Sequence, residues 1–157
     1  MDKREFAGRV NACEKKLFRV AYLTLGRYEA CEDAVQEALL RAWEGRAALR
    51  DPAYFDTWLI RILINECHNL QRRTASRPVA ALPDDIPLPD PPDRALRDAL
   101  MKLDEKYRAP LVLHHLEGYP VRQTAAMLRT TGGVVRWRLE KGIQMLRRLL
   151  DDGEGLK

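Results

Sequence analysis

The chain has 157 residues and a formal net charge of +4, since 27 Lys and Arg residues oppose 23 Asp and Glu residues. This length fits one ordinary domain or two very small ones, and so mild a charge is weak support for a nucleic-acid partner. The N-terminal residues lack the apolar core of a signal peptide, and no apolar run approaches the ~20 residues that span a bilayer. The three cysteines have no CxxC spacing, which favours reduced thiols over a disulfide framework. We therefore expect a cytoplasmic protein without direct membrane insertion.

Helical patterns lie on either side of a proline-rich segment. The spacing of apolar residues predicts helices at about 3–26, 29–45 and 52–73 in the N-terminal part. It predicts further helices at about 93–103, 105–117, 120–128 and 131–150 in the C-terminal part. Between them, residues 78–92 contain six of the nine prolines, whose rings remove backbone donors and disfavour helical geometry. The sequence thus predicts an all-α protein of two small helical domains, 1–73 and 93–157, joined by an extended Pro- and Asp-rich linker at 74–92.

The second predicted helix carries an unusual outer face. In EDAVQEALLRAWEGR, residues 32–46, five apolar side chains follow helical spacing and define the face directed at the core: Val35, Ala38, Leu39, Ala42 and Trp43. The opposite face presents Asp33, Gln36 and Glu37 in a chain that is basic overall. The core pattern leaves these three residues without a structural role.

The third predicted helix, within residues 54–73, combines aromatic residues with a polar stripe. Four polar residues recur at spacings of i, i+4, i+7 and i+11: Arg61, Asn65, His68 and Arg72. Tyr54, Phe55 and Trp58 precede them and are able to stack on exposed bases, although a core role is favoured for Trp58. An asparagine amide can pair with a base edge or line a pocket for an unstacked base. The alternative is that the aromatic residues belong to the core and that the polar stripe is an ordinary solvated helix face.

The C-terminal segment PVRQTAAMLRTTGGVVRWRLEKG, residues 120–142, has a helix-turn-helix pattern. A short helix ends near residues 129–133, and a second apolar stripe then begins at Val134 and Val135. The outer face of this second helix carries Arg136, Trp137, Arg138 and Lys141. Such a helix suits the major groove, with cations near phosphates. The alternatives are a solvated basic surface and, for Trp137, a core position in a locally distorted helix.

Metal binding and catalysis find little support in the sequence. Adjacent side chains in Cys67–His68 and His114–His115 cannot both face one ion from a regular helix. No Gly-rich phosphate loop is present, and the acids of residues 32–37 lie along one exposed helix. We expect no metal site, no cofactor and no enzymatic activity.

Taken together, the two halves resemble a group IV, or extracytoplasmic-function, RNA polymerase sigma factor of the sigma-70 family. The segments AYLTLGRYEACEDAVQEALLRAW and TWLIRILINECHNLQRR resemble the sigma-2 domain. The segments LDEKYRAPLVLHHLEGYPVRQTAAML and GGVVRWRLEKGIQMLRRLL resemble the sigma-4 domain. The resemblance implies that the protein binds core RNA polymerase and directs promoter-specific initiation at −10 and −35 elements.

The resemblance also assigns roles to particular residues. Asp33, Gln36 and Glu37 match the DxxQE motif that docks on the β′ clamp helices, where acids suit a basic protein surface better than DNA. The −10 element is assigned to Arg50, Asp51, Arg61, Asn65, His68 and Arg72, with residues 50–53 as the loop that captures a flipped base. The −35 element is assigned to Arg136, Trp137, Arg138 and Lys141.

The expected partners are core RNA polymerase (through the β′ clamp helices and the β flap), promoter DNA and an anti-sigma factor. The linker would run through the polymerase toward the RNA exit region. Three positions depart from the family pattern: Thr124, Val134 and Trp137. Two other functions compete with this interpretation. A helix-turn-helix regulator acting without polymerase would explain only residues 120–148, and a helical adaptor would have no promoter affinity.

Overall fold

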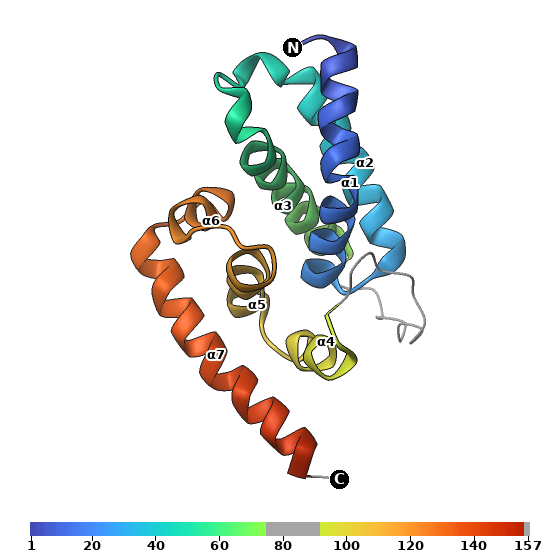
Figure 1. Ribbon diagram of the computed structural model, residues 1–157. Coiled ribbons are helices and arrows are strands. Elements are labelled where there is room, and N and C mark those ends of the chain that lie inside the picture. Colours follow the sequence, from blue (N-terminus) through green and yellow to red (C-terminus); the bar gives the residue numbers. More distant parts are fainter. Residues whose placement is uncertain (75–91, 156–157) are drawn as a thin grey trace. The chain divides into compact units, whose positions relative to one another are not determined.

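The computed structural model describes residues 1–74 and 92–155, so most of the expected linker, residues 75–91, lies outside the described residues (Figure 1). Every regular element within these ranges is helical, as the sequence predicted. The chain divides into two compact units, Met1–Pro89 and Asp90–Lys157.

The first unit is built on three long helices. They are α1 (Lys3–Leu25), α2 (Tyr28–Glu44) and α3 (Phe55–Thr74), with short 3₁₀ helices η1 (Arg46–Ala48) and η2 (Pro52–Tyr54) before α3. Each long helix packs against the other two (Figure 1). Helix α1 begins after Asp2, whose side chain accepts a hydrogen bond from the Glu5 N–H at 2.8 Å. It ends at Leu25 and is followed by Gly26, whose left-handed φ of 72° is easily adopted only by glycine.

The apolar stripe predicted for α2 enters the core of this unit. Ala38 and Ala42 are fully buried, and Val35 nearly so, whereas Leu39 and Trp43 are half-buried. The partial exposure of Leu39 and Trp43 has a local cause. They line an open, largely apolar groove of about 350 Å³ together with Lys3, Phe6, Ala7, Val10 and Asn11 of α1.

The aromatic residues at the start of α3 have separate environments. Phe55 is only 2% exposed and packs edge-on against Phe6, with ring centroids 5.8 Å apart, so of the two roles considered for it the core role holds and base stacking is excluded. Its burial follows from a position where α1 and α3 meet. Trp58 is half-buried beside Phe55, and only Tyr54 of the three is largely exposed.

The cysteines are all buried in the first unit, and no disulfide occurs within residues 1–74 and 92–155. Burial is the largest cause that raises the pKa of Cys13 to about 11 and that of Cys31 to about 12. The thiol of Cys31 also donates a hydrogen bond to the Arg27 carbonyl at 2.8 Å. These cysteines therefore serve the core as small apolar side chains.

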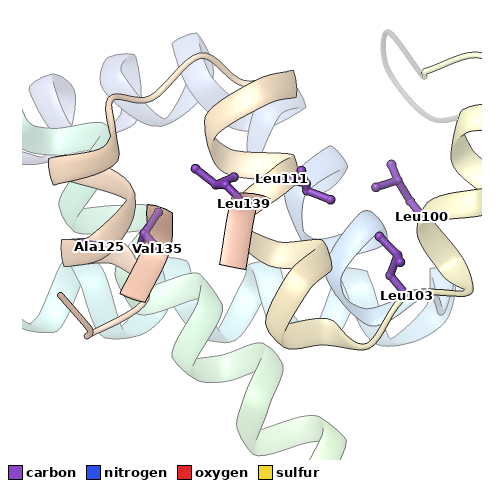
Figure 2. Packing of buried hydrophobic residues seen from close by; sticks show 6 residues of the cluster. All are labelled: Leu100, Leu103, Leu111, Ala125, Val135 and Leu139. Carbon is purple, nitrogen blue, oxygen red and sulfur yellow. The ribbon is translucent and has the colours of Figure 1, made fainter. Parts of the chain in front are cut away.

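The second unit packs short helices against one long helix. The elements are α4 (Arg94–Met101), α5 (Glu105–Leu111), the π-helical turn η3 (Val112–Leu116), α6 (Val121–Met127) and α7 (Gly132–Gly155). Helix α7 contacts α4, α5 and α6. Figure 2 shows the core between them, which consists of Leu100, Leu103, Leu111, Ala125, Val135 and Leu139. A Cβ atom at Gly142 would lie 3.0 Å from Leu111, so this glycine allows α5 and α7 to pack closely.

The continuous helix predicted for residues 105–117 is interrupted. Pro110 lies inside α5, and its ring nitrogen has no hydrogen to donate to the preceding turn. Immediately afterwards the hydrogen bonds widen to a π-helical step, in which the Glu117 N–H donates to the Val112 carbonyl at 2.9 Å. Periodicity alone does not distinguish this register change from a regular helix.

The turn between α6 and α7 differs in detail from the expected glycine break. Gly132 and Gly133 open α7, and the residue with a left-handed backbone is Arg129, with φ of 56°. The Thr131 hydroxyl accepts a hydrogen bond from the Val134 N–H at 3.3 Å, as a helix N-cap does. Thr124, a departure from the family pattern, is fully buried and donates from its hydroxyl to the Tyr119 carbonyl at 3.3 Å.

Candidate functional site

The outer face of α2 presents polar groups at the spacing that the sequence indicated. Asp33 and Gln36 are exposed, and Glu37 is half-buried. Leu40 lies one turn after Gln36, outside the apolar stripe predicted for this helix, and its 52% exposure adds an apolar group that the sequence analysis did not assign to this face. The face therefore combines acid, amide and apolar groups, which suits a protein surface better than a phosphate backbone.

Arg41 joins this face to α3. Its Nε atom lies 2.6 Å from Oε1 of Glu66 and 3.4 Å from Oε1 of Glu37. The Glu66 side chain is 2% exposed, while that of Arg41 is 51% exposed. Within the described part of the chain, Oε1 of Glu66 accepts no hydrogen bond of good geometry, so its charge is balanced chiefly by the nearby guanidinium. Helical spacing does not predict this pair, because its partners lie on different helices.

Only part of the polar stripe predicted on α3 is fully exposed at the surface. Arg61 and Arg72 are exposed, whereas Asn65 and His68 are half-buried. Arg72 donates to the side-chain oxygen of Asn69, which holds its guanidinium along the helix. Asn65 and Arg61 lie one turn apart, an arrangement that places an amide beside a cation.

The segment before α3 is held by local hydrogen bonds. Arg50 and Asp51 are both exposed. The Asp51 carboxylate caps η2 by accepting from the Ala53 N–H at 3.0 Å, and Arg9 of α1 donates to the Pro52 carbonyl at 3.1 Å. This segment therefore has a defined conformation against α1.

The start of α7 presents a cationic and aromatic face. Arg136, Trp137 and Lys141 are exposed, and Arg138 is half-buried. Trp137 is 52% exposed, which excludes the core position considered for it. A Cβ atom at Gly132 would lie 3.5 Å from Nη1 of Arg136, so this guanidinium folds back over the first turn of the helix.

The adjacent histidines of the second unit, His114 and His115, interact with each other and with the local backbone. His114 shares a hydrogen bond with the Tyr119 carbonyl at 2.7 Å, and burial followed by the neighbouring His114 lowers the pKa of His115. Within residues 1–74 and 92–155, no three His, Cys, Asp or Glu side chains come together as a metal site would require. None of the described helices combines the length and apolar character that a membrane crossing needs.

Comparison with known proteins accounts for both units. Residues 10–77 match the family model for Sigma-70 region 2, and residues 93–146 match that for Sigma-70, region 4. The chain belongs to the sigma-70 family. It is 36% identical to the ECF RNA polymerase sigma factor SigM of Mycobacterium tuberculosis, over 87% of this chain and 72% of SigM. It is 26% identical to the ECF sigma factor SigW of Bacillus subtilis, over 96% of this chain and 91% of SigW.

The fold agrees with this assignment. The sigma factor RpoE of Bartonella quintana, solved in complex with the anti-sigma factor NepR, superposes with a TM-score of 0.78 at 22% identity. The superposition covers 94% of this chain and 98% of RpoE. The predicted fold class and the resemblance to extracytoplasmic-function sigma factors are thus confirmed.

Membership of this family establishes the general function. The sigma factor binds core RNA polymerase and directs transcription initiation at promoters. Sigma factors are initiation factors rather than a class of enzymes. A helix-turn-helix regulator acting without polymerase is not favoured, because the region 2 match covers the half of the chain that such a regulator leaves unexplained.

Proposed function

We propose that residues 1–73 dock on core polymerase and read the −10 element, and that residues 93–157 read the −35 element, with 74–92 as the linker. The main support is the contrast between two exposed faces: an acidic and amide face on α2, and a cationic face on α7. A protein partner suits the first, and DNA suits the second. In this proposal the sigma factor acts in the cytoplasm without a cofactor, a metal or a catalytic residue.

Polymerase docking is assigned to Asp33, Gln36 and Glu37 against the β′ clamp helices. Asp33 and Gln36 are exposed and able to enter an interface directly. Glu37 is already paired with Arg41 at 3.4 Å, so part of its charge is balanced within the sigma factor. We therefore assign the larger share of the docking energy to Asp33 and Gln36.

Reading of the −10 element is assigned to a set of residues on α3 and the segment before it: Arg50, Asp51, Arg61, Asn65, His68 and Arg72. Arginines hold the backbone of a separated strand, while an amide can recognise a base edge. The half-buried position of Asn65 next to exposed Arg61 suits this division. The conformation of residues 50–53, tied to α1 through Arg9, supports their role in closing over an unstacked base.

Reading of the −35 element is assigned to Arg136, Trp137, Arg138 and Lys141. Arg136 lies near the start of α7, the part of a recognition helix that approaches base edges. Lys141 lies one turn beyond Trp137 and suits a phosphate contact. Arg138 is half-buried, so it has the smallest share of this surface.

Two further partners complete the proposal. The β flap of the polymerase would receive the second unit, as the resemblance implies for the sigma-4 domain. An anti-sigma factor would control availability of the protein. RpoE of Bartonella quintana was solved with such a partner, and its similar fold supports the same kind of control here.

Run-off transcription tests the proposed function. Core polymerase together with the purified sigma factor should transcribe a subset of a genomic promoter pool that core polymerase alone does not. The selected promoters should share two elements, one at −10 and one at −35. Promoter-independent transcription, or binding to promoter duplex without core polymerase, would contradict the proposal and favour a plain DNA-binding regulator.

Asn65→Ala should impair promoter opening while sparing core binding. A base held in a pocket has to recover an unstacking energy of a few kcal/mol, and one bidentate base contact supplies about 1–3 kcal/mol. Permanganate reactivity of −10 thymines should therefore fall on closed duplex and recover on a template that is already melted at −10. The matched control is Gln71→Ala, another half-buried amide on α3, which should open the promoter normally. Equal opening by Asn65→Ala and the parent protein would move base recognition to other residues.

A further inference from the structure

Trp137 is the most conspicuous apolar residue of the proposed −35 face. It is 52% exposed, although tryptophan usually buries most of its surface. The ring of half-buried Tyr107, from α5, lies beside it with ring centroids 6.3 Å apart. The close approach of α5 and α7 at Gly142 fixes this pair, since a Cβ atom at Gly142 would lie 3.4 Å from Cβ of Tyr107. The two rings form one aromatic ledge across two helices.

Cations surround this aromatic ledge of Tyr107 and Trp137. Nζ of Lys141 lies 6.0 Å from the Trp137 ring centroid, and Nζ of Lys106 lies 5.1 Å from that of Tyr107. Arg136 is the preceding exposed residue. A cationic rim favours a polyanion over an apolar protein partner. Exposed Glu140 also lies on this side of α7, and an acid is tolerated near DNA where it faces base edges rather than phosphates.

The position of Trp137 along α7 directs it toward base edges. It is the sixth residue of the helix, and side chains of a helix lean toward its N-terminus. Gly133 stands one turn earlier without a side chain, and a Cβ atom there would meet only the Thr131 hydroxyl, at 4.0 Å. No side chain at position 133 therefore covers the tryptophan ring. The N-terminal part of a recognition helix is the part that enters the major groove.

The major groove offers one prominent apolar group to such a ring, the C5-methyl group of thymine. We propose that Trp137, supported by Tyr107, packs against thymine C5-methyl groups in the −35 element and so selects A·T pairs there. This inference rests on the proposed −35 role of α7. Trp137 is then a specificity-determining residue, and Tyr107 is a positioning residue that supports its ring. Arg136 and Lys141 make DNA contacts that do not depend on the thymine methyl groups.

Deoxyuridine substitution tests the contact one methyl group at a time. Holoenzyme is titrated at fixed salt with promoters obtained by run-off selection, in which each −35 thymine on either strand is replaced by deoxyuridine. For the parent protein, at least one replacement should weaken binding about fourfold, the value expected for one lost methyl contact. For Trp137→Ala, the same replacement should have no effect, because the contact is already absent.

Two control variants separate this contact from general DNA affinity. Lys141→Ala should weaken binding to thymine and deoxyuridine promoters by the same factor and keep the fourfold difference. Trp137→Phe should restore part of that difference, since a smaller ring still reaches one methyl group. Thermal unfolding should be unchanged in Trp137→Ala because the side chain is exposed.

Several outcomes would overturn the inference while leaving the proposed function intact. These are a −35 element without an A·T pair, insensitivity of the parent holoenzyme to every deoxyuridine, or an equal deoxyuridine effect in the parent and Trp137→Ala. Unchanged promoter affinity of Trp137→Ala would assign the ledge to a protein partner instead. Failure of the proposed function has a different signature, namely a parent holoenzyme that shows no dependence on any −35 sequence.

Discussion

Asp33→Lys combined with Gln36→Ala should weaken binding of the sigma factor to core polymerase by at least ~30-fold. Interface groups that lose their partners typically cost ~1–3 kcal/mol each, and ~1.4 kcal/mol corresponds to a factor of ten. Both residues are exposed on α2, so the change should leave the core of the first unit intact. Affinity is measured by titrating labelled sigma factor with core polymerase, and helix content is followed by circular dichroism.

The matched control reverses one acid elsewhere in the same unit. Glu14→Lys changes an exposed residue of α1 and alters the net charge as Asp33→Lys does. It should bind core polymerase nearly as well as the parent protein, which separates the specific face from the total charge. Undiminished binding of the double variant, or equal loss in Glu14→Lys, would show that the outer face of α2 is not the docking site.

Arg41→Met should lower the free energy of unfolding of the first unit by about 2–4 kcal/mol. Glu66 is 2% exposed, and removing the guanidinium 2.6 Å away leaves a buried carboxylate without its balancing charge. The expected loss of unfolding free energy is smaller than for a fully buried ion pair, because the Arg41 side chain is 51% exposed. Amide hydrogen exchange of α3 during a urea titration of the full chain measures the effect within this unit.

A second variant tests whether the lost stability comes from the unbalanced charge of Glu66. When both partners are replaced, in Arg41→Met with Glu66→Met, no charge stays buried, and most of the lost stability should return. Arg73→Met, at an exposed position near the end of α3, should be almost neutral. If the double variant is no more stable than Arg41→Met, an unbalanced charge on Glu66 is not the cause of the lost stability.

The helical spacing of apolar residues in the sequence predicted much of the fold. The apolar residues of α2 and of α7 lie at helical spacing, and burial of Ala38, Ala42, Val135 and Leu139 follows from that spacing. Periodicity describes one helix at a time, however. The Arg41–Glu66 pair joins two helices, and Phe55 is buried because α1 and α3 meet there, so neither was available from the local pattern.

Other features of the fold could not be predicted from spacing, because they depend on local backbone hydrogen bonds. The π-helical turn after Pro110 and the left-handed Arg129 depend on hydrogen bonds that no spacing rule describes. For the candidate site, composition indicated the acidic face of α2 and the basic face of α7. Spacing left Leu40 outside the apolar stripe of α2 and placed Trp137 on the outer face of α7, but only the packed helices show how much of each apolar side chain is exposed.

The buried cysteines determine how this sigma factor would respond to oxidants. Peroxides and disulfides react with the thiolate form, and a pKa of about 11 leaves only ~1 in 10⁴ of the Cys13 side chains in that form at neutral pH. Cys31 has a still higher pKa, and Cys67 is 0% exposed. The folded protein is therefore a poor redox sensor.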